Sequence, residues 1–218
     1  MLSVVIPTLD SEADLGPCLE RMKPADEIIV VDGGSRDSTA AIAERAGARL
    51  VIAPKGRGSQ LSAGAEAAAG DWLLFLHSDT LPAPGWSEAV ATHIRSNPGK
   101  AGCFGFRLAD KSWQARAVER AVAARVSLFG LPYGDQGLLV SRSLYRSVGG
   151  YRPLPLMEDV DLVRRIGRRR LRRLEAEAWT SAERWRRDGW LRRSGRNLLC
   201  LAMYQAGLAP ERIARFYG

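Results

Sequence analysis

The sequence has few cysteines and no long apolar run. Three of its 218 residues are cysteine, and an odd number of distant cysteines without ligand spacing argues against a disulfide framework or a zinc site. No apolar run approaches the ~20 residues that a transmembrane helix needs. Nothing before the first expected strand, which begins at Leu2, resembles a secretory signal, so we expect a cytoplasmic protein.

Common phosphate-binding signatures are also missing. Residues 55–60 (KGRGSQ) combine glycines with two cations, but they lack the P-loop spacing and do not complete a dinucleotide fingerprint. The same loop is explained either by phosphate contact or by a solvated basic surface. No internal repeat or low-complexity linker divides the chain, and its length suits one α/β domain.

Positive charge is in excess. The formal net charge is +8 and the pI is near 9.9, which suits phosphorylated ligands, an anionic membrane or nucleic acid. No DNA- or RNA-binding motif appears, so we expect no nucleic-acid partner. Between Arg184 and Met203, arginines alternate with Trp185 and Trp190. This pattern suits a membrane interface, although packing against the sheet would explain it equally well.

The most informative apolar run is WLLFL at residues 72–76, which leads directly into His77-Ser78-Asp79. Five consecutive apolar residues predict a strand buried on both faces of a mainly parallel sheet. In open α/β sheets, ligands bind beyond the carboxyl ends of the strands. We therefore expect Asp79 to lie at the functional edge.

The rest of the chain alternates between strand and helix patterns. Strands are expected at residues 3–8, 27–31, 49–53 and 101–108, with helices between them, which is typical of a sheet covered on both faces. Beyond residue 108 we expect a helix at 112–128, a polar turn at 133–137 and a short strand at 138–140. A further helix should start at Met157 and run into the arginine-rich residues 164–173. Its acidic start and basic end complement the helix dipole, and the functional alternative is that one of the acids serves as a base.

The second strand ends in Asp32-Gly33-Gly34-Ser35. Two glycines permit close backbone approach to a ligand, and Asp32 can bond ribose hydroxyls or a base. The structural alternative is a tight, capped strand-to-helix turn.

Four segments together resemble family 2 glycosyltransferases of the GT-A fold: residues 3–8, residues 30–39, His77-Ser78-Asp79, and Gly149-Gly150-Tyr151 ahead of Glu158-Asp159. The resemblance covers residues 2–185. It implies a Rossmann-like, mainly parallel sheet with helices on both faces, here with a C-terminal helical segment. It also implies a nucleotide-diphosphate sugar donor, a divalent metal (Mn²⁺ or Mg²⁺) and inversion at the anomeric carbon.

The resemblance assigns roles by position. Asp79 would bind the metal, and Asp159 would be the base. Glu158 would orient Asp159 or bind a sugar hydroxyl. The donor site would be lined by Pro7, Thr8, Asp32 and Arg57, while Asp135 and Gln136 would contact the sugar or the acceptor. Residues 1–108 would form the nucleotide-binding half, 109–180 the acceptor half and 181–218 the helical segment.

Three positions depart from the family pattern. His77 replaces the first acid of the D-x-D motif, and it either joins Asp79 as a metal ligand, favouring Mn²⁺ over Mg²⁺, or is a hydrogen-bonded histidine. Gly33 stands where many members have a second aspartate, which leaves UDP or GDP open. Ala182-Glu183-Arg184-Trp185 resembles Q-x-x-R-W without its glutamine, which disfavours processive polymerisation.

Two other functions compete with this interpretation. A sugar-phosphate nucleotidyltransferase would need a glycine-rich loop after the first strand, but residues 9–14 are LDSEAD. A non-catalytic basic adaptor for membranes or nucleic acid would account for the arginines, but not for three acids at the ends of strands and helices. For a transferase, we expect a peripheral position at the inner face of the membrane and a lipid-linked acceptor.

Overall fold

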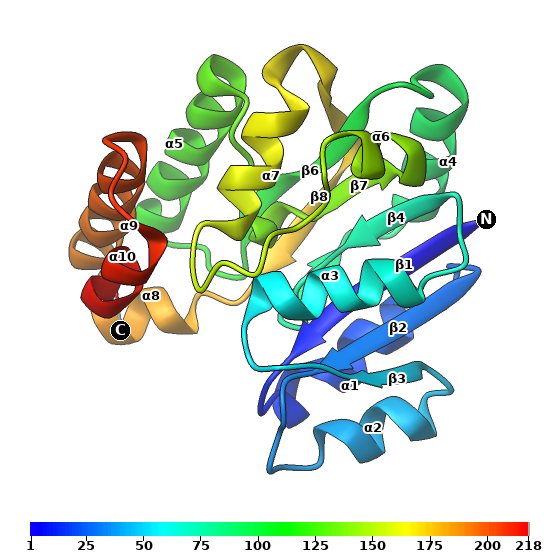
Figure 1. The fold of residues 1–218 in the computed structure, drawn as a ribbon. Coiled ribbons are helices and arrows are strands. Elements are labelled where there is room, and N and C mark those ends of the chain that lie inside the picture. Colours follow the sequence, from blue (N-terminus) through cyan, green and yellow to red (C-terminus); the bar gives the residue numbers. More distant parts are fainter. Residues whose placement is uncertain (218) are drawn as a thin grey trace.

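The computed structural model describes residues 1–217, which form one eight-stranded sheet flanked by helices (Figure 1). The strand order is β3-β2-β1-β4-β7-β6-β8-β5. The strands are β1 (Leu2–Thr8), β2 (Glu27–Asp32), β3 (Arg49–Ile52), β4 (Trp72–Phe75), β5 (Thr80–Pro82), β6 (Ala101–Leu108), β7 (Leu138–Ser141) and β8 (Leu171–Thr180). Strands β1 to β4 are parallel, β7 is antiparallel to both of its neighbours, and β6 runs parallel to β8. The expected α/β class with a mostly parallel sheet is confirmed.

Ten α-helices are described. They are α1 (Glu12–Met22), α2 (Thr39–Arg45), α3 (Arg57–Ala67), α4 (Trp86–Ser96), α5 (Trp113–Phe129), α6 (Arg142–Ser147), α7 (Glu158–Ile166), α8 (Glu183–Asp188), α9 (Trp190–Gln205) and α10 (Pro210–Tyr217). Two short 3₁₀ helices are also present, η1 (Gly134–Gln136) and η2 (Arg168–Arg170). Figure 1 shows α3 and α7 in front of the sheet, and α1 behind it.

Alternate residues of the central strands serve two separate cores. In β1, Val5 joins the cluster that packs under α3 and α7, whereas Val4 and Ile6 join the cluster under α1 and α4. This division follows from the two-residue period of a strand. Because β4 is buried at all four positions, the expectation of a strand covered on both faces is confirmed.

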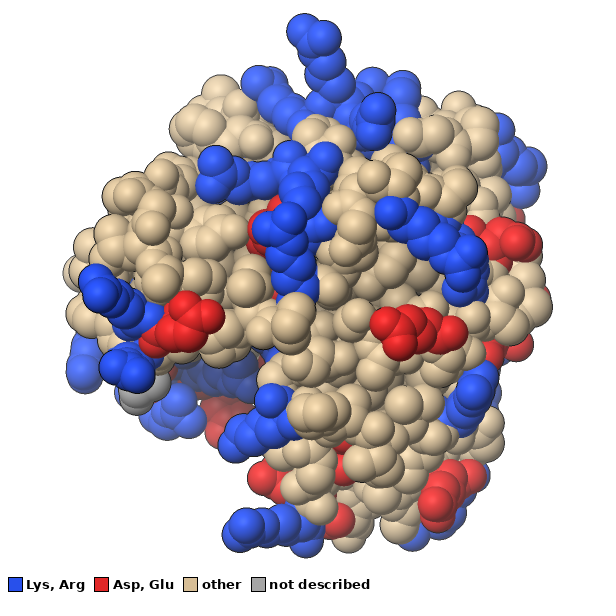
Figure 2. Space-filling model, in the orientation of Figure 1, with Lys and Arg blue, Asp and Glu red and all other residues tan. Residues whose placement is uncertain are grey.

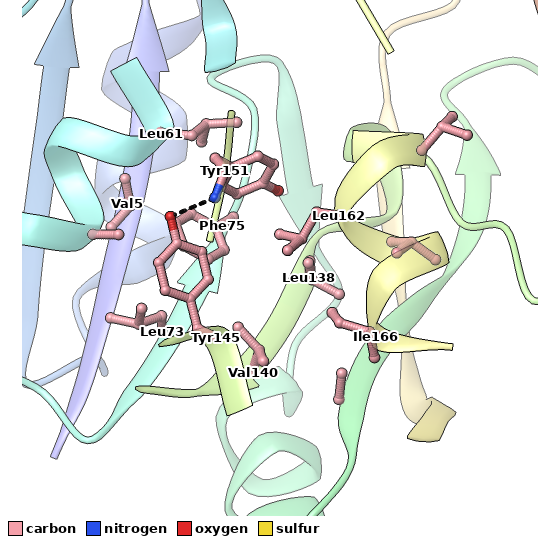
Figure 3. Close-up of a cluster of buried hydrophobic side chains, with 14 of the residues drawn as sticks. Val5, Leu61, Leu73, Phe75, Leu138, Val140, Tyr145, Tyr151, Leu162 and Ile166 are labelled. Carbon is pink, nitrogen blue, oxygen red and sulfur yellow. Dashed lines mark hydrogen bonds between the residues drawn. The ribbon is translucent and has the colours of Figure 1, made fainter. Parts of the chain in front are cut away.

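An aromatic group fixes the segment that leads into α7 (Figure 3). The ring of Phe75 lies 5.5 Å from that of Tyr145 and 4.9 Å from that of Tyr151. The backbone N–H of Tyr151 donates to the Tyr145 hydroxyl at 2.9 Å. Gly150 has a φ of +58° and lies against the Tyr145 ring, where a side chain would collide. These contacts place the first turn of α7 beside the carboxyl edge of the sheet.

The expected helix through the arginine run is wrong beyond Ile166. Gly167, with a φ of +85°, ends α7, and Arg172 and Arg173 lie in strand β8. Strand β8 pairs with β6 in a register that shifts between Cys103 and Gly105. The shift breaks the alternation of buried and exposed residues, so no period of two marks the strand in the sequence.

The C-terminal segment is helical, as expected, up to the last described residue. The Tyr204 hydroxyl of α9 donates to Asp161 of α7 at 3.4 Å. The guanidinium of Arg196 lies 4.8 Å from the centre of the Tyr217 ring, which joins α9 to α10. In residues 1–217, none of the helices combines the length and apolarity needed to cross a bilayer.

Candidate active site

A cavity of about 130 Å³ lies beyond the carboxyl ends of the strands. Five residues singled out from the sequence line it: Arg57, His77, Asp79, Asp135 and Asp159. They come from the start of α3, the segment after β4, η1 and the first turn of α7. Residues more than 100 positions apart in the chain therefore meet at the edge where α/β sheets bind ligands.

Asp79 follows β4 and directly precedes β5. Its carboxylate is 17% exposed and lies 3.9 Å from Nη2 of Arg184. The Thr80 hydroxyl donates to Asp79 Oδ1 at 3.4 Å, and β5 is itself held by antiparallel pairing with β8. The acid is positioned by few bonds of its own, and it keeps lone pairs for a cation or a ligand.

His77 is packed tightly between neighbouring elements. A Cβ added at Gly134 would lie 2.3 Å from His77 Nε2, so only glycine fits there. The Gly134 N–H donates to Asp159 Oδ2 at 2.8 Å, which links η1 to α7. Burial, reinforced by the cation of Arg57, lowers the pKa of His77 to about 4. The imidazole is therefore neutral near pH 7, which is the form that binds metals.

Asp135 presents a buried carboxyl to the cavity. The pKa of Asp135 is raised to about 6, mainly by burial; Arg125 opposes the shift, and Asp159 and Asp79 add to it. Within the described residues, its Oδ1 atom is buried and has no hydrogen-bond partner. A buried acceptor without a partner costs free energy, so this oxygen is suited to a cation or a ligand hydroxyl.

Glu158 lies behind the cavity and does not line it. It is 1% exposed, and its Oε1 is 2.8 Å from Nε of Arg57. Burial raises its pKa to about 7, with Asp159 adding to the shift and Arg57 opposing it. The geometry supports a positioning role for Glu158, directed at Arg57.

The structure does not bring Pro7, Thr8 or Asp32 into the cavity lining. Asp32 is buried at the end of β2, where Oδ2 accepts from the N–H groups of Gly34 at 3.0 Å and Ser35 at 2.9 Å. Its Oδ1 accepts from the Thr8 hydroxyl at 3.2 Å. In the structure, Asp32 therefore stabilises the turn that follows β2, which is the structural alternative to ligand binding given in the sequence analysis.

Gln136 also lies away from the cavity. It is buried, and its Nε2 donates to the carbonyl of Phe104 in β6 at 3.1 Å. Asp135 and Gln136 are adjacent in a 3₁₀ turn, which directs their side chains to different sides.

The C-terminal helices contribute cavity residues that the sequence analysis did not assign. Trp185 lies in α8, Arg193, Asn197 and Cys200 lie in α9, and Tyr217 ends α10. The spacing of 193, 197 and 200 is that of one helix face, and this was the signal available in the sequence. Arg193 is held by Asp188 at 2.8 Å.

The donor set fits a metal that is shared with a ligand. Among residues 1–217, no three His, Cys, Asp or Glu side chains are arranged to hold an ion by themselves. Magnesium sites commonly use one or two carboxylates together with water and substrate phosphates. Asp79 and Asp135, with neutral His77 close by, meet that requirement.

The sheet is mostly parallel, and a cavity lined by both aspartates and arginines lies at its carboxyl edge, which is where open α/β sheets bind ligands. The family model "Glycosyl transferase family 2" matches residues 3–142. The chain belongs to this family.

Relatives and solved structures agree with this membership. A PGL/p-HBAD biosynthesis glycosyltransferase of Mycobacterium bovis is 40% identical over 90 residues, covering 36% of this chain and 35% of the relative. A glucosyl-3-phosphoglycerate synthase of Mycolicibacterium paratuberculosis is 37% identical over 95 residues, covering 37% and 29%. The match therefore spans about a third of the length of these curated relatives.

The fold is also found in a solved structure. The crystal structure of glucosyl-3-phosphoglycerate synthase from Mycobacterium tuberculosis in complex with Mn²⁺, UDP-glucose and phosphoglyceric acid superimposes with a TM-score of 0.58 at 24% identity. The match covers 79% of this chain and 68% of that one. This likeness establishes the GT-A fold.

Proposed function

We propose that the chain is a metal-dependent, inverting glycosyltransferase that transfers a hexose from a nucleoside-diphosphate sugar to an acceptor hydroxyl. The observation that carries the proposal is the meeting of Asp79, Asp135 and Asp159 in one cavity with Arg57. Family membership supports sugar transfer, and the glucosyl relatives favour UDP-glucose as the donor to test first. We retain residues 1–108 as the donor half and 109–180 as the acceptor half of this proposal.

Asp79 and Asp135 would hold Mn²⁺ or Mg²⁺ together with the donor diphosphate, and neutral His77 is a further candidate ligand. The ion would act as a Lewis acid on the leaving phosphate oxygens. Arg57 adds a fixed positive charge to the same cavity, and its pairing with buried Glu158 holds the guanidinium in place. Charge that develops on the diphosphate would thus meet preorganised cations.

Asp159 is the proposed base. It lines the cavity, and the N–H of Gly134 fixes its Oδ2. The acceptor oxygen would form a bond to the anomeric carbon as the bond from that carbon to the diphosphate oxygen breaks. The acceptor proton would pass to Asp159. Attack on the face opposite the leaving group gives inversion.

We further propose that α9 contacts an anionic membrane, which would suit a lipid-linked acceptor at the inner face. Leu191, Leu198 and Leu199 are 90%, 68% and 48% exposed on this helix. The membrane proposal rests on these leucines and not on the tryptophans. Trp185 and Trp190 stack with rings 5.9 Å apart and pack against the cluster that contains Phe106.

The proposed mechanism is tested with Asp159→Asn. Loss of a general base should lower transfer by ~10²–10⁴-fold and leave donor affinity nearly unchanged. Turnover and donor affinity are measured on the same preparation, with Asp71→Asn at an exposed position away from the cavity as the control. A stable Asp159→Asn protein with near-normal turnover would overturn the mechanism.

A further inference from the structure

A second, larger cavity lies on the other side of η1 from the candidate active site. It has a volume of about 700 Å³ and is bounded by α5, β6 and the segment from η2 into β8. Gln136 contributes to this cavity, whereas its neighbours Gly134 and Asp135 line the active-site cavity. We refer to it as the arginine groove.

The lining of the groove is strongly basic. Six arginines contribute, and Glu119 is the one acid among the lining residues of the described chain; the arginines are Arg107, Arg116, Arg120, Arg168, Arg172 and Arg173. Figure 2 shows several basic side chains on the upper half of the molecule, around the place where Figure 1 has α7.

Acidic partners neutralise only part of this charge. Glu119 is buried and binds both Arg107 at 2.9 Å and Arg116 at 2.7 Å. Glu177 binds Arg107 at 2.7 Å and lies 3.7 Å from Arg173. Two carboxylates therefore pair with three of the six arginines: Arg107, Arg116 and Arg173.

Three groove arginines, Arg120, Arg168 and Arg172, form no ion pair with any described residue. Arg168 donates to the Ser127 carbonyl at 2.8 Å, and Arg172 donates to the Leu171 carbonyl at 2.8 Å. An arginine has five N–H donors, so most of these donors remain available. The Nε atom of Arg116 is also buried without a hydrogen-bond partner in residues 1–217.

Two glycines make room for these side chains. A Cβ at Gly105 would lie 2.5 Å from Nη2 of Arg173, and a Cβ at Gly130 would lie 2.7 Å from Cγ of Arg168. Gly130 has a φ of +63°, which favours glycine in any case. The backbone thus allows both arginines to lie close against the walls of the groove.

We propose that the arginine groove binds an anion carrying two or more phosphate groups. Guanidinium groups match phosphate oxygens in paired hydrogen bonds, and a cavity of this volume exceeds what a single phosphate would fill. The anion would be either a free phosphorylated molecule or a phospholipid headgroup. This site does not depend on the proposed transferase activity.

The test uses inorganic tripolyphosphate in metal-free buffer with EDTA, so that Asp79 cannot recruit the probe through a metal. Calorimetry compares the wild type with the double variant Arg120→Gln/Arg172→Gln. Each arginine removed should weaken binding at least ~10-fold. The control, Arg45→Gln/Arg146→Gln, removes the same charge from exposed positions outside the groove and should leave the affinity unchanged.

Vesicles of phosphatidylcholine with and without cardiolipin, a lipid that carries two phosphate groups, distinguish the two sources of phosphate. Tripolyphosphate binding that requires the groove arginines supports a free ligand, and vesicle binding alone with the same requirement supports a headgroup. Equal affinities for the groove variant and the wild type, equal losses in the groove and control variants, or no binding of either probe would overturn the proposal.

Discussion

Burial acts on the ionisable side chains around the cavity according to their charge. It raises the pKa of Asp135 to about 6 and that of Glu158 to about 7, and it lowers the pKa of His77 to about 4. In each case the neutral form is favoured, because a low-dielectric environment penalises charge. At neutral pH a neutral imidazole therefore lies in the cavity beside Asp135, whose ionisation is sensitive to a nearby cation, and Glu158 behind the cavity shares that sensitivity.

The raised pKa of Glu158 predicts a pH-dependent stability. Its ordinary value is 4.5 and its folded value is about 7, so between these values the folded state binds more protons than the unfolded state. The corresponding stability is present below pH 4.5 and is lost as the pH rises through 7. Glu158→Gln cannot ionise, so its melting temperature should rise relative to the wild type across this window.

Melting curves of both proteins across this window test the expectation. The exposed Glu175 in β8, changed to Gln, is the control and should track the wild type. A difference between Glu158→Gln and wild type that does not change with pH would contradict the assignment of the shift to Glu158.

Asp79→Asn should abolish metal-dependent donor binding and leave the fold intact. The carboxylate makes one long hydrogen bond, and its 3.9 Å pair with the exposed Arg184 contributes at most ~1 kcal/mol. For the wild type, UDP-glucose at 100 times its dissociation constant in Mn²⁺ should add ~2.7 kcal/mol of stability. A thermal-shift assay reads both quantities, and an Asn variant that still gains this stability would exclude Asp79 as the metal-binding acid.

Asp32 illustrates what a sequence motif does not specify. An aspartate followed by two glycines at a strand end is compatible with ligand binding and with a capped turn. In the structure its oxygens are occupied by the Gly34 and Ser35 N–H groups and the Thr8 hydroxyl. The competition between these bonds and a ligand depends on three-dimensional geometry, which the spacing of residues does not contain.

At the scale of elements, sequence patterns predicted helices and strands correctly where the local preference of a segment agrees with its packing in the fold. The apolar runs of β1, β2 and β4 and the amphipathic α4 were predictable from periodicity. Strand β8 was not, because extra residues between Arg173 and Glu177 shift its register against β6, and because its sequence begins in an arginine run. The C-terminal wall of the cavity was missed for a related reason, since nothing local indicates which helix face meets the sheet.

Replacing two helical glycines with alanine should change the stability of the protein in opposite directions, because Gly64 of α3 packs against the sheet and Gly195 of α9 does not. A Cβ at Gly64 would lie 2.3 Å from Cγ1 of Val5 and 2.8 Å from Cγ2 of Val31, whereas Gly195 in α9 has no neighbour within 4 Å. Gly64→Ala should therefore destabilise the protein by ~1–3 kcal/mol through overpacking. Gly195→Ala should stabilise it by up to ~1 kcal/mol through helix propensity.

Urea unfolding of the two variants measures both effects under the same conditions. A stabilising Gly64→Ala would show that α3 does not approach the sheet as closely as described. A strongly destabilising Gly195→Ala would mean that this face of α9 is covered.

At the scale of the whole molecule, the exposed leucines of α9 predict membrane attachment. Leu198→Ser/Leu199→Ser should reduce co-sedimentation with anionic vesicles at least ~10-fold, because burying a leucine side chain is worth ~1.5–3 kcal/mol. Ile52→Ser is the control, since Ile52 is similarly exposed but lies on β3 at the far edge of the sheet. Binding that is no better with anionic than with neutral lipid would count against the proposal.

The pairing of β5 with β8 also has a consequence for how the protein folds. β5 lies at the end of the sheet, where Thr80 is aligned with Thr180. Contacts this distant in sequence form slowly, because a long loop must close before they stabilise the chain. Strands β1 to β4 can assemble from the first 75 residues, but Asp79 acquires its position only once β8 has been synthesised and has docked. The cavity residues of the nascent chain should therefore reach their final positions late, well after its central strands have formed.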